Sequence, residues 1–289
     1  MGEVADTIEI VTPRTVVWFS AGAASAVAAK LTLADTPDAV IAYTDPGSEH
    51  PDNARFIDDC ERWFGAPVLR LRSPKYVDTW QVWEERRFLV GPAGALCTAE
   101  LKKKVRYAFE RPDDVQVFGY TAEEQHRADR FQEQNPGVDL RTPLIERGLT
   151  KDDCLGIIAS SGIEMPAMYL LGYRNNNCIG CPKGGIGYWN KIRVDFPDVF
   201  ARMARLEREL DATVLRTEVR ARRAKGRPAP TGRGRKSIPL FLDELDPTRG
   251  NHLKEPSFEC SLVCTATAEE LVAVTALPPT SSLGEVRRG

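Results

Sequence analysis

Short apolar runs that recur between helix-length stretches are the feature that most limits how this chain can fold. Four runs have the β-branched and aromatic character of strands, and they are Thr15–Phe19, Ala39–Tyr43, Pro67–Leu71 and Val115–Gly119. Strands joined through helices need crossover connections, which give a mostly parallel sheet with both faces covered. The sequence therefore predicts an α/β fold with helices on both faces of the sheet, plus a cysteine-bearing C-terminal extension.

Helix signals stand between these runs. Apolar residues follow helical spacing over Asn53–Phe64, and Gly65 stops the pattern. Thr150 and Asp153 form a start resembling a capping box for a helix that reaches Ser160. These local signals predict helices in the places where a parallel sheet needs its connections.

Charge and apolar content exclude several classes of protein. Lys and Arg number 39 and Asp and Glu 41, so the net charge of -2 creates no general attraction to nucleic acid or membrane. The longest uncharged stretch, from Thr15 to Ala29, is too short and too rich in small residues to span a bilayer. The N-terminus is acidic and lacks an apolar signal region. We therefore expect a cytoplasmic protein with no membrane partner.

Composition changes near residue 216. The stretch 216–236 holds nine Lys or Arg residues against one Glu, with Gly and Pro toward its end. We expect a helix from Pro197 to about Arg216, then a basic flexible linker. The predicted domains are residues 1–215 for nucleotide binding, 216–256 for the linker and 257–289 for the tail. The basic stretch is also a candidate contact for nucleic acid.

The segment Ser20–Ser25, between the first strand and the next helix, has the composition of a phosphate cradle. Small residues such as Gly22 and Ala23 let backbone N–H groups approach phosphate oxygens, and a helix N-terminus adds partial positive charge. Ser20 and Ser25 can donate hydroxyls. The segment matches neither GxGxxG nor GxxxxGK[ST], which disfavours dinucleotide folds and Walker NTPases. A tight connection without any ligand has the same composition, so both interpretations stay open.

The residues Trp18–Val27 resemble the PP-loop of the adenine nucleotide α-hydrolase superfamily, in the branch of phosphoadenylyl-sulfate (PAPS) and adenylyl-sulfate reductases. The ATP-pyrophosphatase branch has Gly and Asp where this chain has Ala21 and Ala24. The difference favours a sulfonucleotide reductase. An ATP substrate, the alternative, would bring Mg²⁺ as a cofactor.

Two further segments match this family in order. Tyr43–Asp52 resembles the segment after the second strand, and the resemblance implies that Asp45 and Glu49 lie beside the nucleoside.

The segment that begins at Gly119 resembles one whose basic residues contact phosphate or sulfate, which implies that role for Arg127. Lys103, in a basic run that also occurs in the family, is expected to neutralise the same anion. The plainer interpretation of that run is a solvated helix face.

Seven cysteines in a reducing compartment are not expected to form a disulfide framework. Cys178 and Cys181 form a CxxC, and Cys260 and Cys264 form a CxxxC, spacings typical of metal or redox chemistry. The adenylyl-sulfate reductases of the resembled family hold a [4Fe-4S] cluster. The resemblance thus implies Cys97, Cys178, Cys181 and Cys264 as ligands. Structural zinc, or free thiols and a redox pair, are the alternatives.

Phe258–Leu262 resembles the family's C-terminal motif, which carries the catalytic cysteine. The resemblance makes Cys260 a nucleophile toward the sulfur of adenylyl sulfate or its 3′-phosphate. Cys260 is also a candidate metal ligand, and the sequence does not separate the two roles.

These expectations combine into a PAPS reductase-like enzyme that binds an adenine nucleotide and takes electrons from a thioredoxin-type donor. The first alternative is an ATP-dependent sulfurtransferase or nucleic-acid-modifying enzyme. The second is a non-catalytic nucleotide-binding module with a structural zinc site. The sequence leaves the oligomeric state open, with a homo-oligomer among the options.

Overall fold

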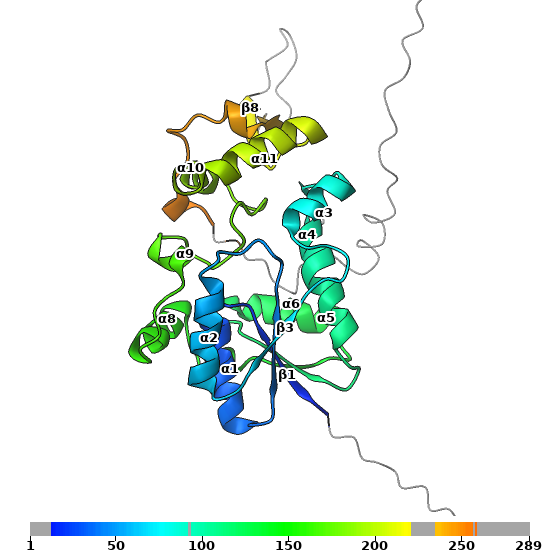
Figure 1. Cartoon of the computed structure of the whole chain (residues 1–289), viewed down its shortest axis with the longest axis vertical. Coiled ribbons are helices and arrows are strands. Elements are labelled where there is room, and N and C mark those ends of the chain that lie inside the picture. Colours follow the sequence, from blue (N-terminus) through cyan, green and yellow to red (C-terminus); the bar gives the residue numbers. More distant parts are fainter. Residues whose placement is uncertain (1–12, 92–93, 221–234, 257, 259–289) are drawn as a thin grey trace, which may run out of the picture. The chain divides into compact units, whose positions relative to one another are not determined.

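The computed structural model describes residues 13–91, 94–220, 235–256 and 258 (Figure 1). The chain divides into two compact units and passes between them several times. The first, here called the sheet unit, contains the described residues up to Thr44 together with Asp52–Leu71 and Ala108–Pro166. The second, here called the CxxC unit, contains the described residues of Asp45–Pro51, of Arg72–Tyr107 and from Ala167 onward.

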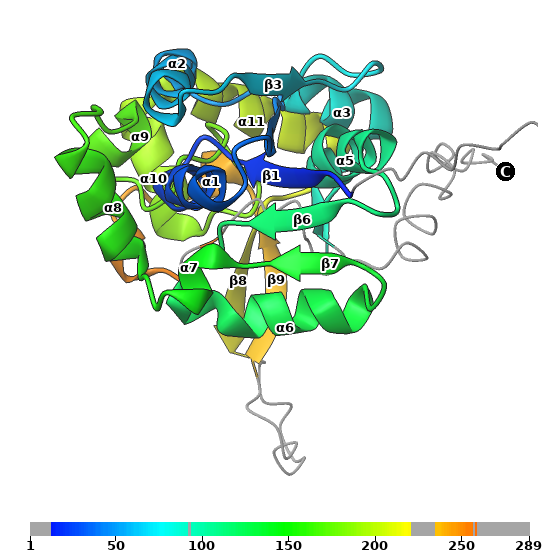
Figure 2. The same cartoon turned by 90° about the horizontal axis from the view of Figure 1, so that it is seen from below.

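The sheet unit is built on five parallel strands in the order β3-β2-β1-β6-β7. Their bounds are β1 Thr15–Phe19, β2 Val40–Thr44, β3 Val68–Leu71, β6 Val115–Phe118 and β7 Asp139–Arg141. Figure 2 shows β1, β6 and β7 side by side and pointing the same way. The four predicted strands and the parallel sheet are therefore confirmed, and β7 is a strand that the sequence analysis did not find.

Helices cover both faces of this sheet. They are α1 Ala23–Asp35, α2 Asn53–Phe64, α6 Gln125–Gln134, α7 Pro143–Glu146 and α8 Lys151–Ser160, with a 3-10 turn η2 at Ala122–Glu124. Val17 and Phe19 belong to the buried cluster formed with α1, α2 and α8. Phe118 points to the other face, where its ring lies 5.3 Å from that of Phe131 on α6. The predicted α/β class is confirmed.

Local capping explains where two of these helices begin and end. Helix α2 ends at Gly65, which adopts the left-handed conformation at φ 72 and donates its N–H to the Glu61 carbonyl. Helix α8 begins with the reciprocal capping box of Thr150 and Asp153. Both signals had been visible in the sequence, and both are confirmed.

The CxxC unit is mostly helical and packs around large aromatic side chains. Its helices are α3 Thr79–Arg86, α4 Leu96–Thr98, a π-helical turn η1 at Ala99–Lys103, α9 Ala167–Leu170, α10 Ile186–Asp195 and α11 Pro197–Leu210, with 3-10 turns η3 Leu242–Glu244 and η4 His252–Lys254. Helix α5, Lys104–Phe109, starts in this unit and ends in the sheet unit. Two short strands, β4 Val90–Gly91 and β5 Gly94–Ala95, pair antiparallel. Trp83 and Trp189 are fully buried in its core. No helix in the described ranges combines the length and apolar character that a bilayer crossing needs.

The structure corrects the expectation for the region after α11. The helix ends at Leu210 rather than near Arg216, and Asp211 leaves it in the left-handed conformation. Strand β8, Leu215–Arg220, then pairs antiparallel with β9, Arg235–Leu240. The two described ends of the basic stretch 216–236, within the predicted linker 216–256, therefore lie in strands, while residues 221–234 lie outside the described residues.

A buried carboxylate explains why these strands form despite their many charges. Glu207 on α11 accepts hydrogen bonds from the N–H groups of Val214 at 2.7 Å and Leu242 at 2.7 Å. Leu215 and Leu240, opposite each other in the register, are both buried. These contacts are tertiary, so the run of arginines and lysines concealed a hairpin. The predicted boundary at residue 215 also differs from the structure, in which the CxxC unit includes Arg72–Tyr107.

Candidate functional site

The β1–α1 loop of the sheet unit presents a helix N-terminus without a side-chain cap. Gly22 occupies the N-cap position in an extended conformation, and no side chain bonds to the first turn of α1 from that position. The first turn also contains no acidic residue. The first amides of a helix have no partner within the helix, and they carry the positive end of its dipole. This loop can accept an anion.

Two hydroxyl groups fix the shape of the loop. Ser25 accepts a hydrogen bond from the Ser20 N–H at 3.0 Å and donates one to the Gly22 carbonyl at 3.0 Å. The Ser20 and Ser25 hydroxyl oxygens are 3.0 Å apart. Ser25 is buried whereas Ser20 is exposed. Ser25 thus serves the loop itself, and Ser20 is the hydroxyl that solvent or a ligand can reach.

Ala21 takes an unusual conformation in this loop. Its φ is 54, in the left-handed region that favours glycine, and its side chain is fully buried. The turn is therefore tight although alanine, not glycine, stands at this position.

Gly119, directly after β6, lets the sheet approach the loop closely. A Cβ atom at this position would lie 2.8 Å from Ser25 Cα and 2.9 Å from Ser25 N. The obstacle is backbone, which cannot rotate away as a side chain can. Glycine is therefore required here by space, and the start of α1 is set against the end of β6.

Arg127, on α6 of the same unit, is held by neighbours along the chain. Its guanidinium forms an ion pair with Glu124 and lies 5.1 Å from the ring centroid of Tyr120. The charge of Arg127 is thus balanced by a carboxylate within the sheet unit, and its role with an anion stays a prediction.

Asp45 belongs to the CxxC unit and has the contacts of a turn residue. It accepts a hydrogen bond from the Gly47 N–H at 2.8 Å and from Arg72 Nε at 2.9 Å. Gly47 has φ 70, and a Cβ there would lie 2.0 Å from the Val77 carbonyl oxygen. These contacts define a compact Asx turn. The proposed nucleoside contact of Asp45 is not tested by them.

Glu49 and the lysines of η1 form a buried charged cluster in the CxxC unit. Lys102 Nζ lies 3.2 Å from Glu49 Oε1, and both side chains are almost completely buried. Lys103 is only 3% exposed. The plain interpretation of this run as a solvated helix face is therefore wrong for Lys102 and Lys103. The π-helical turn, a feature common at functional sites, carries both of them.

The CxxC turn is closed around one tyrosine. The hydroxyl of Tyr188 accepts hydrogen bonds from the N–H groups of Gly180 at 3.1 Å and Cys181 at 2.9 Å, and it donates to the Cys178 carbonyl at 3.3 Å. The Ile179 N–H donates to the Ser48 carbonyl at 3.0 Å. The N–H groups of Ile179, Gly180 and Cys181 thus all donate to oxygen atoms.

Burial of Tyr188 has an electrostatic consequence. The side chain is 2% exposed, and burial together with the neighbouring Cys181 and Cys178 raises the pKa of its hydroxyl well above the ordinary value. The hydroxyl therefore stays protonated and can both accept and donate hydrogen bonds. Tyr188 is therefore an uncharged, buried hydrogen-bonding partner for the backbone of the CxxC turn.

The described cysteines do not complete a metal site. Cys97, Cys178 and Cys181 are buried, unpaired in disulfides, and all in the CxxC unit. Within the described ranges, no three or more His, Cys, Asp or Glu side chains are placed to hold a metal ion. Cys260 and Cys264 lie outside the described residues. The described residues alone therefore do not fit a four-thiolate cluster or zinc site.

The predicted site residues divide between the two units. The sheet unit holds Ser20, Gly22, Ala23, Ser25 and Arg127, whereas the CxxC unit holds Asp45, Glu49, Lys103, Cys97, Cys178 and Cys181. The sequence analysis missed the pairing of Lys102 with Glu49 and the central position of Tyr188. No sequence signal distinguishes a buried lysine from its exposed neighbours, whereas the polar and aromatic run Gly187–Asn190 after the CxxC is a signal that could have pointed to Tyr188.

Comparisons with known proteins give limited relationships. No family model matches the chain. An uncharacterized protein of Methanocaldococcus jannaschii is 25% identical over 228 residues, which cover 72% of this chain and 44% of that protein. The chain thus spans less than half the length of this relative.

Among solved structures, the crystal structure of PAPS reductase from Candida auris in complex with phosphate is similar to this chain. The TM-score is 0.44 and the sequence identity is 11%, and the alignment covers 58% of this chain and 83% of that one. At this level of likeness the activity has to be argued from the site itself.

Proposed function

We propose that this chain is a PAPS reductase-like enzyme in which the β1–α1 loop binds the phosphate of an adenine nucleotide. The observation that carries the proposal is the first turn of α1, which has neither a side-chain cap nor an acidic residue. Backbone amides at a helix start are a general site for phosphate and sulfate groups. The exposed hydroxyl of Ser20 supplies a further donor beside them.

The side chains of the loop are small, which leaves room for a nucleotide phosphate at the helix start. Gly22 has no side chain and Ala23 carries only a methyl group, so neither side chain can bond to the first-turn amides, and the close approach of Gly119 to Ser25 keeps the helix start fixed. A pre-formed site loses less conformational entropy on binding. A phosphate can therefore bind there without rearrangement of the loop.

A sulfonucleotide suits this loop better than ATP with magnesium. In the resembled superfamily the ATP-cleaving branch places an aspartate where this chain has Ala24. Mg²⁺ prefers carboxylate and water ligands, and the first turn of α1 offers no carboxylate. Adenylyl sulfate or its 3′-phosphate is the substrate that this proposal favours.

The proposed reaction uses the tail cysteines. The thiolate of Cys260 attacks the sulfur of the sulfonucleotide, the S–O bond to the nucleotide breaks, and AMP or its 3′-phosphate leaves. A second thiol, with Cys264 as the candidate, then attacks Cys260 Sγ and releases sulfite, which leaves a disulfide. A dithiol donor of the thioredoxin type returns two electrons and two protons to that disulfide.

The cysteine pair Cys178 and Cys181 is proposed as half of a thiolate site for an iron–sulfur cluster or zinc, completed by cysteines outside the described residues. Soft thiolates suit both. Iron, zinc and acid-labile sulfide measured in protein purified without oxygen test this part independently of turnover.

Binding is the first test of the proposal. Isothermal titration of the full chain with adenylyl sulfate, PAPS and ATP should give the tightest binding for a sulfonucleotide. Gly22→Asp should weaken that binding by about tenfold or more, because a carboxylate at the N-cap occupies the first-turn amides and repels phosphate. The same change should slightly stabilise α1, so lost binding cannot be ascribed to unfolding.

A matched control keeps the charge change but moves it away from the loop. Gly137 is exposed, and a Cβ there would meet nothing within 4 Å. Gly137→Asp should leave nucleotide affinity unchanged. Equal nucleotide affinity of the wild type and Gly22→Asp would show that the loop is not part of the binding site.

Turnover is the second test. Sulfite release from adenylyl sulfate or PAPS, with a thioredoxin-type donor, should be measurable in the wild type and absent in Cys260→Ser. Binding of ATP with formation of AMP, and no sulfite from either sulfonucleotide, would instead favour the ATP-dependent alternative.

A further inference from the structure

The segment 250–256, here called the strap, packs directly on the start of α10. A Cβ atom at Gly187 would lie 2.4 Å from His252 N, and one at Gly250 would lie 2.5 Å from Gly187 N. The contact is thus backbone against backbone. Gly250 also has φ 79, which favours glycine a second time. The two glycines therefore let the strap approach α10 with no side chain between them.

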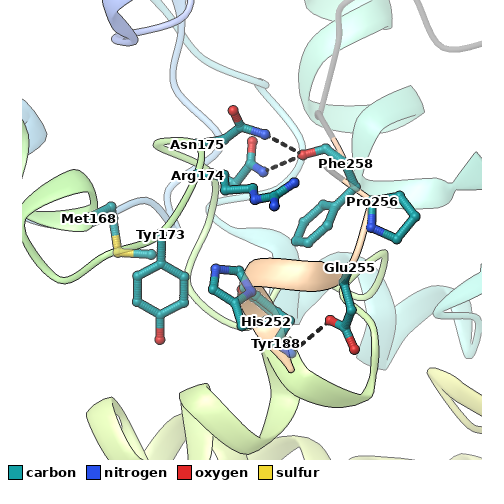
Figure 3. A pocket seen from close by; sticks show the side chains of 10 residues that line it. Met168, Tyr173, Arg174, Asn175, Tyr188, His252, Glu255, Pro256 and Phe258 are labelled. Carbon is teal, nitrogen blue, oxygen red and sulfur yellow. Dashed lines mark hydrogen bonds between the residues drawn. The ribbon is translucent and has the colours of Figure 1, made fainter. Parts of the chain in front are cut away.

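Glu255 bonds the strap to the N-terminus of α10. The N-cap residue Gly185 has no side chain to offer. The Glu255 carboxylate instead accepts hydrogen bonds from the N–H groups of Gly187 at 2.5 Å and Tyr188 at 3.0 Å (Figure 3). A carboxylate at a helix start is stabilised by the dipole as well as by the hydrogen bonds. These two amides therefore report whether the strap lies on α10.

The strap also lines a small cavity in the CxxC unit, to which it supplies three of the ten lining residues (Figure 3). The cavity has a volume of about 20 Å³, which is roughly the room that one water molecule needs. Beyond the strap, the side-chain amides of Asn175 and Asn177 both donate to the carbonyl oxygen of Phe258, at 2.7 Å and 3.0 Å. Movement of the strap away from α10 would therefore enlarge this cavity.

His252 is the histidine of the strap, and its ring lies beside those of two buried tyrosines. The ring centroid is 5.3 Å from that of Tyr173 and 6.0 Å from that of Tyr188. The Nε2 atom of His252 is buried, and no group in the described ranges forms a hydrogen bond with it. A neutral imidazole can leave one nitrogen without a proton, whereas a protonated one carries an N–H on both nitrogens. This environment therefore suits the neutral imidazole.

Four charged side chains influence His252, two of them positive and two negative. They are Lys191 and Asp195 on α10, Arg174 on the loop between α9 and α10, and Glu255 on the strap. Lys191 and Asp195 form an ion pair at 2.9 Å. Burial is the largest influence and lowers the pKa of His252 below its ordinary value of 6.5, while the two carboxylates oppose the shift and the two cations add to it. Tyr173 and Tyr188 are uncharged neighbours, because burial raises the pKa of both hydroxyls.

We propose that His252 is a pH-sensitive latch, which holds the strap on α10 while its imidazole is neutral and releases the strap when the imidazole takes up a proton. Protonation puts a positive charge and a second N–H where the described residues offer no acceptor. In the released strap the imidazole is in water and binds a proton below about pH 6.5. Because the released form binds more protons than the closed form, release increases as pH falls below this value. The latch lies wholly in the CxxC unit and is independent of nucleotide binding in the sheet unit.

Hydrogen exchange of the full chain, followed by NMR at about pH 7.5 and about pH 5.5 without nucleotide, tests the latch. Each exchange rate is divided by that of an unstructured peptide at the same pH, which gives a protection factor free of the direct effect of pH. In the wild type, the protection factors of Gly187 and Tyr188 should fall by up to about tenfold, the limit for one proton over one pH unit. Protection of Cys154, whose amide donates to the Thr150 carbonyl in the sheet unit, should not change.

His252→Phe keeps a ring beside the two tyrosines but cannot take up a proton, so its protection factors at Gly187 and Tyr188 should be the same at both pH values. His252→Gln, which has no titrating group either, serves if the phenylalanine variant fails to fold. His126→Gln is the matched control, because His126 is exposed on α6 of the sheet unit. It should keep the full pH dependence of the wild type.

Equal protection of Gly187 and Tyr188 at the two pH values in the wild type would overturn the proposal. An undiminished fall in His252→Phe would also overturn it, because another group, such as Glu255, would then be responsible. So would a fall of the same size at Cys154, which would indicate general unfolding in acid. Nucleotide titration at about pH 7.5 does not depend on these results, so failure of the latch and failure of the proposed function are distinguishable.

Discussion

The β1–α1 loop and the CxxC turn are both small-residue turns, yet they use their backbone amides in opposite ways. In the loop, the helix start carries no side-chain cap. In the CxxC turn, the N–H groups of Gly180 and Cys181 donate to the hydroxyl of Tyr188, which is buried. The first turn of α1 thus receives no side-chain acceptor from its N-cap residue, whereas these two amides of the CxxC turn have an acceptor within the protein.

This difference separates binding from stability. Changes in an open turn should alter affinity for an anion more than they alter folding, because few internal bonds depend on it. Changes in a closed turn should first alter folding, because buried donors that lose their acceptor cost free energy. Most of the following variants test either binding or stability. The Gly119 variant is expected to change both.

Gly119→Ala should have the largest effect. The added Cβ would meet the backbone of Ser25 at 2.8 Å, so the start of α1 must move. We expect nucleotide affinity to fall on the order of a hundredfold, since small displacements of a rigid site are costly, and stability to fall by about 1 to 3 kcal/mol. Isothermal titration and urea denaturation measure the two effects.

Gly156→Ala, in α8, is the control for that experiment. A Cβ at Gly156 meets nothing within 4 Å, so alanine should stabilise the helix slightly and leave affinity unchanged. Wild-type affinity in Gly119→Ala would show that the helix start is not part of the binding site.

Tyr188→Phe should destabilise the protein by about 3 kcal/mol, because two buried N–H groups lose their acceptor. Nucleotide binding should remain, since the loop lies in the other unit. Tyr107→Phe, at a tyrosine that is 47% exposed, should change stability by less than about 0.5 kcal/mol. Denaturant unfolding followed by fluorescence measures the free energy of unfolding of both variants. Equal values would contradict the role of the Tyr188 hydroxyl as acceptor in the CxxC turn.

Glu207, in the CxxC unit, should make stability fall as pH rises. Burial raises the pKa of this carboxyl from 4.5 to about 7, although the N–H groups of Leu242 and Val214 oppose the shift. Between these values the unfolded chain ionises while the folded protein keeps the proton, so stability decreases by about 3 kcal/mol. Relative to Glu207→Gln, the wild type should lose stability from about pH 4.5 to pH 7. Parallel curves for the two proteins would exclude this role.

Asp114, in the sheet unit, should give a smaller effect of opposite sign. Burial favours its neutral form, but hydrogen bonds from Arg14 and from the Arg111 N–H outweigh it and lower the pKa of the carboxyl. Its stabilisation is therefore present above the unfolded pKa near 3.8 and is lost as pH falls below it. Acid unfolding of Asp114→Asn should be less steep than that of the wild type, and an unchanged slope would contradict the assignment.

Much of the sheet unit could be predicted from local signals. The strands were visible as apolar runs because parallel strands are buried on both faces, and Gly65 and Thr150 marked helix ends through conformations that only a few residue types favour. Gly119 stood out in a motif, and its reason proved to be steric.

The CxxC unit was harder to predict because its decisive contacts join residues far apart in the chain. Lys102 looked like its exposed neighbour Lys104, and only its pairing with Glu49 shows that it is buried. The basic run after α11 looked like a linker, and only the bonds to Glu207 explain why strands form at its two ends.

The sequence alone determined the α/β class, the order of the strands along the chain and the composition of the two turns, since each depends on the spacing of neighbouring residues. Tertiary structure alone decided that the predicted site residues divide between two units and that Glu255 and the asparagines hold the end of the described chain. The physical reason is that burial and hydrogen bonding between distant segments are properties of the packed chain, which residue spacing does not encode.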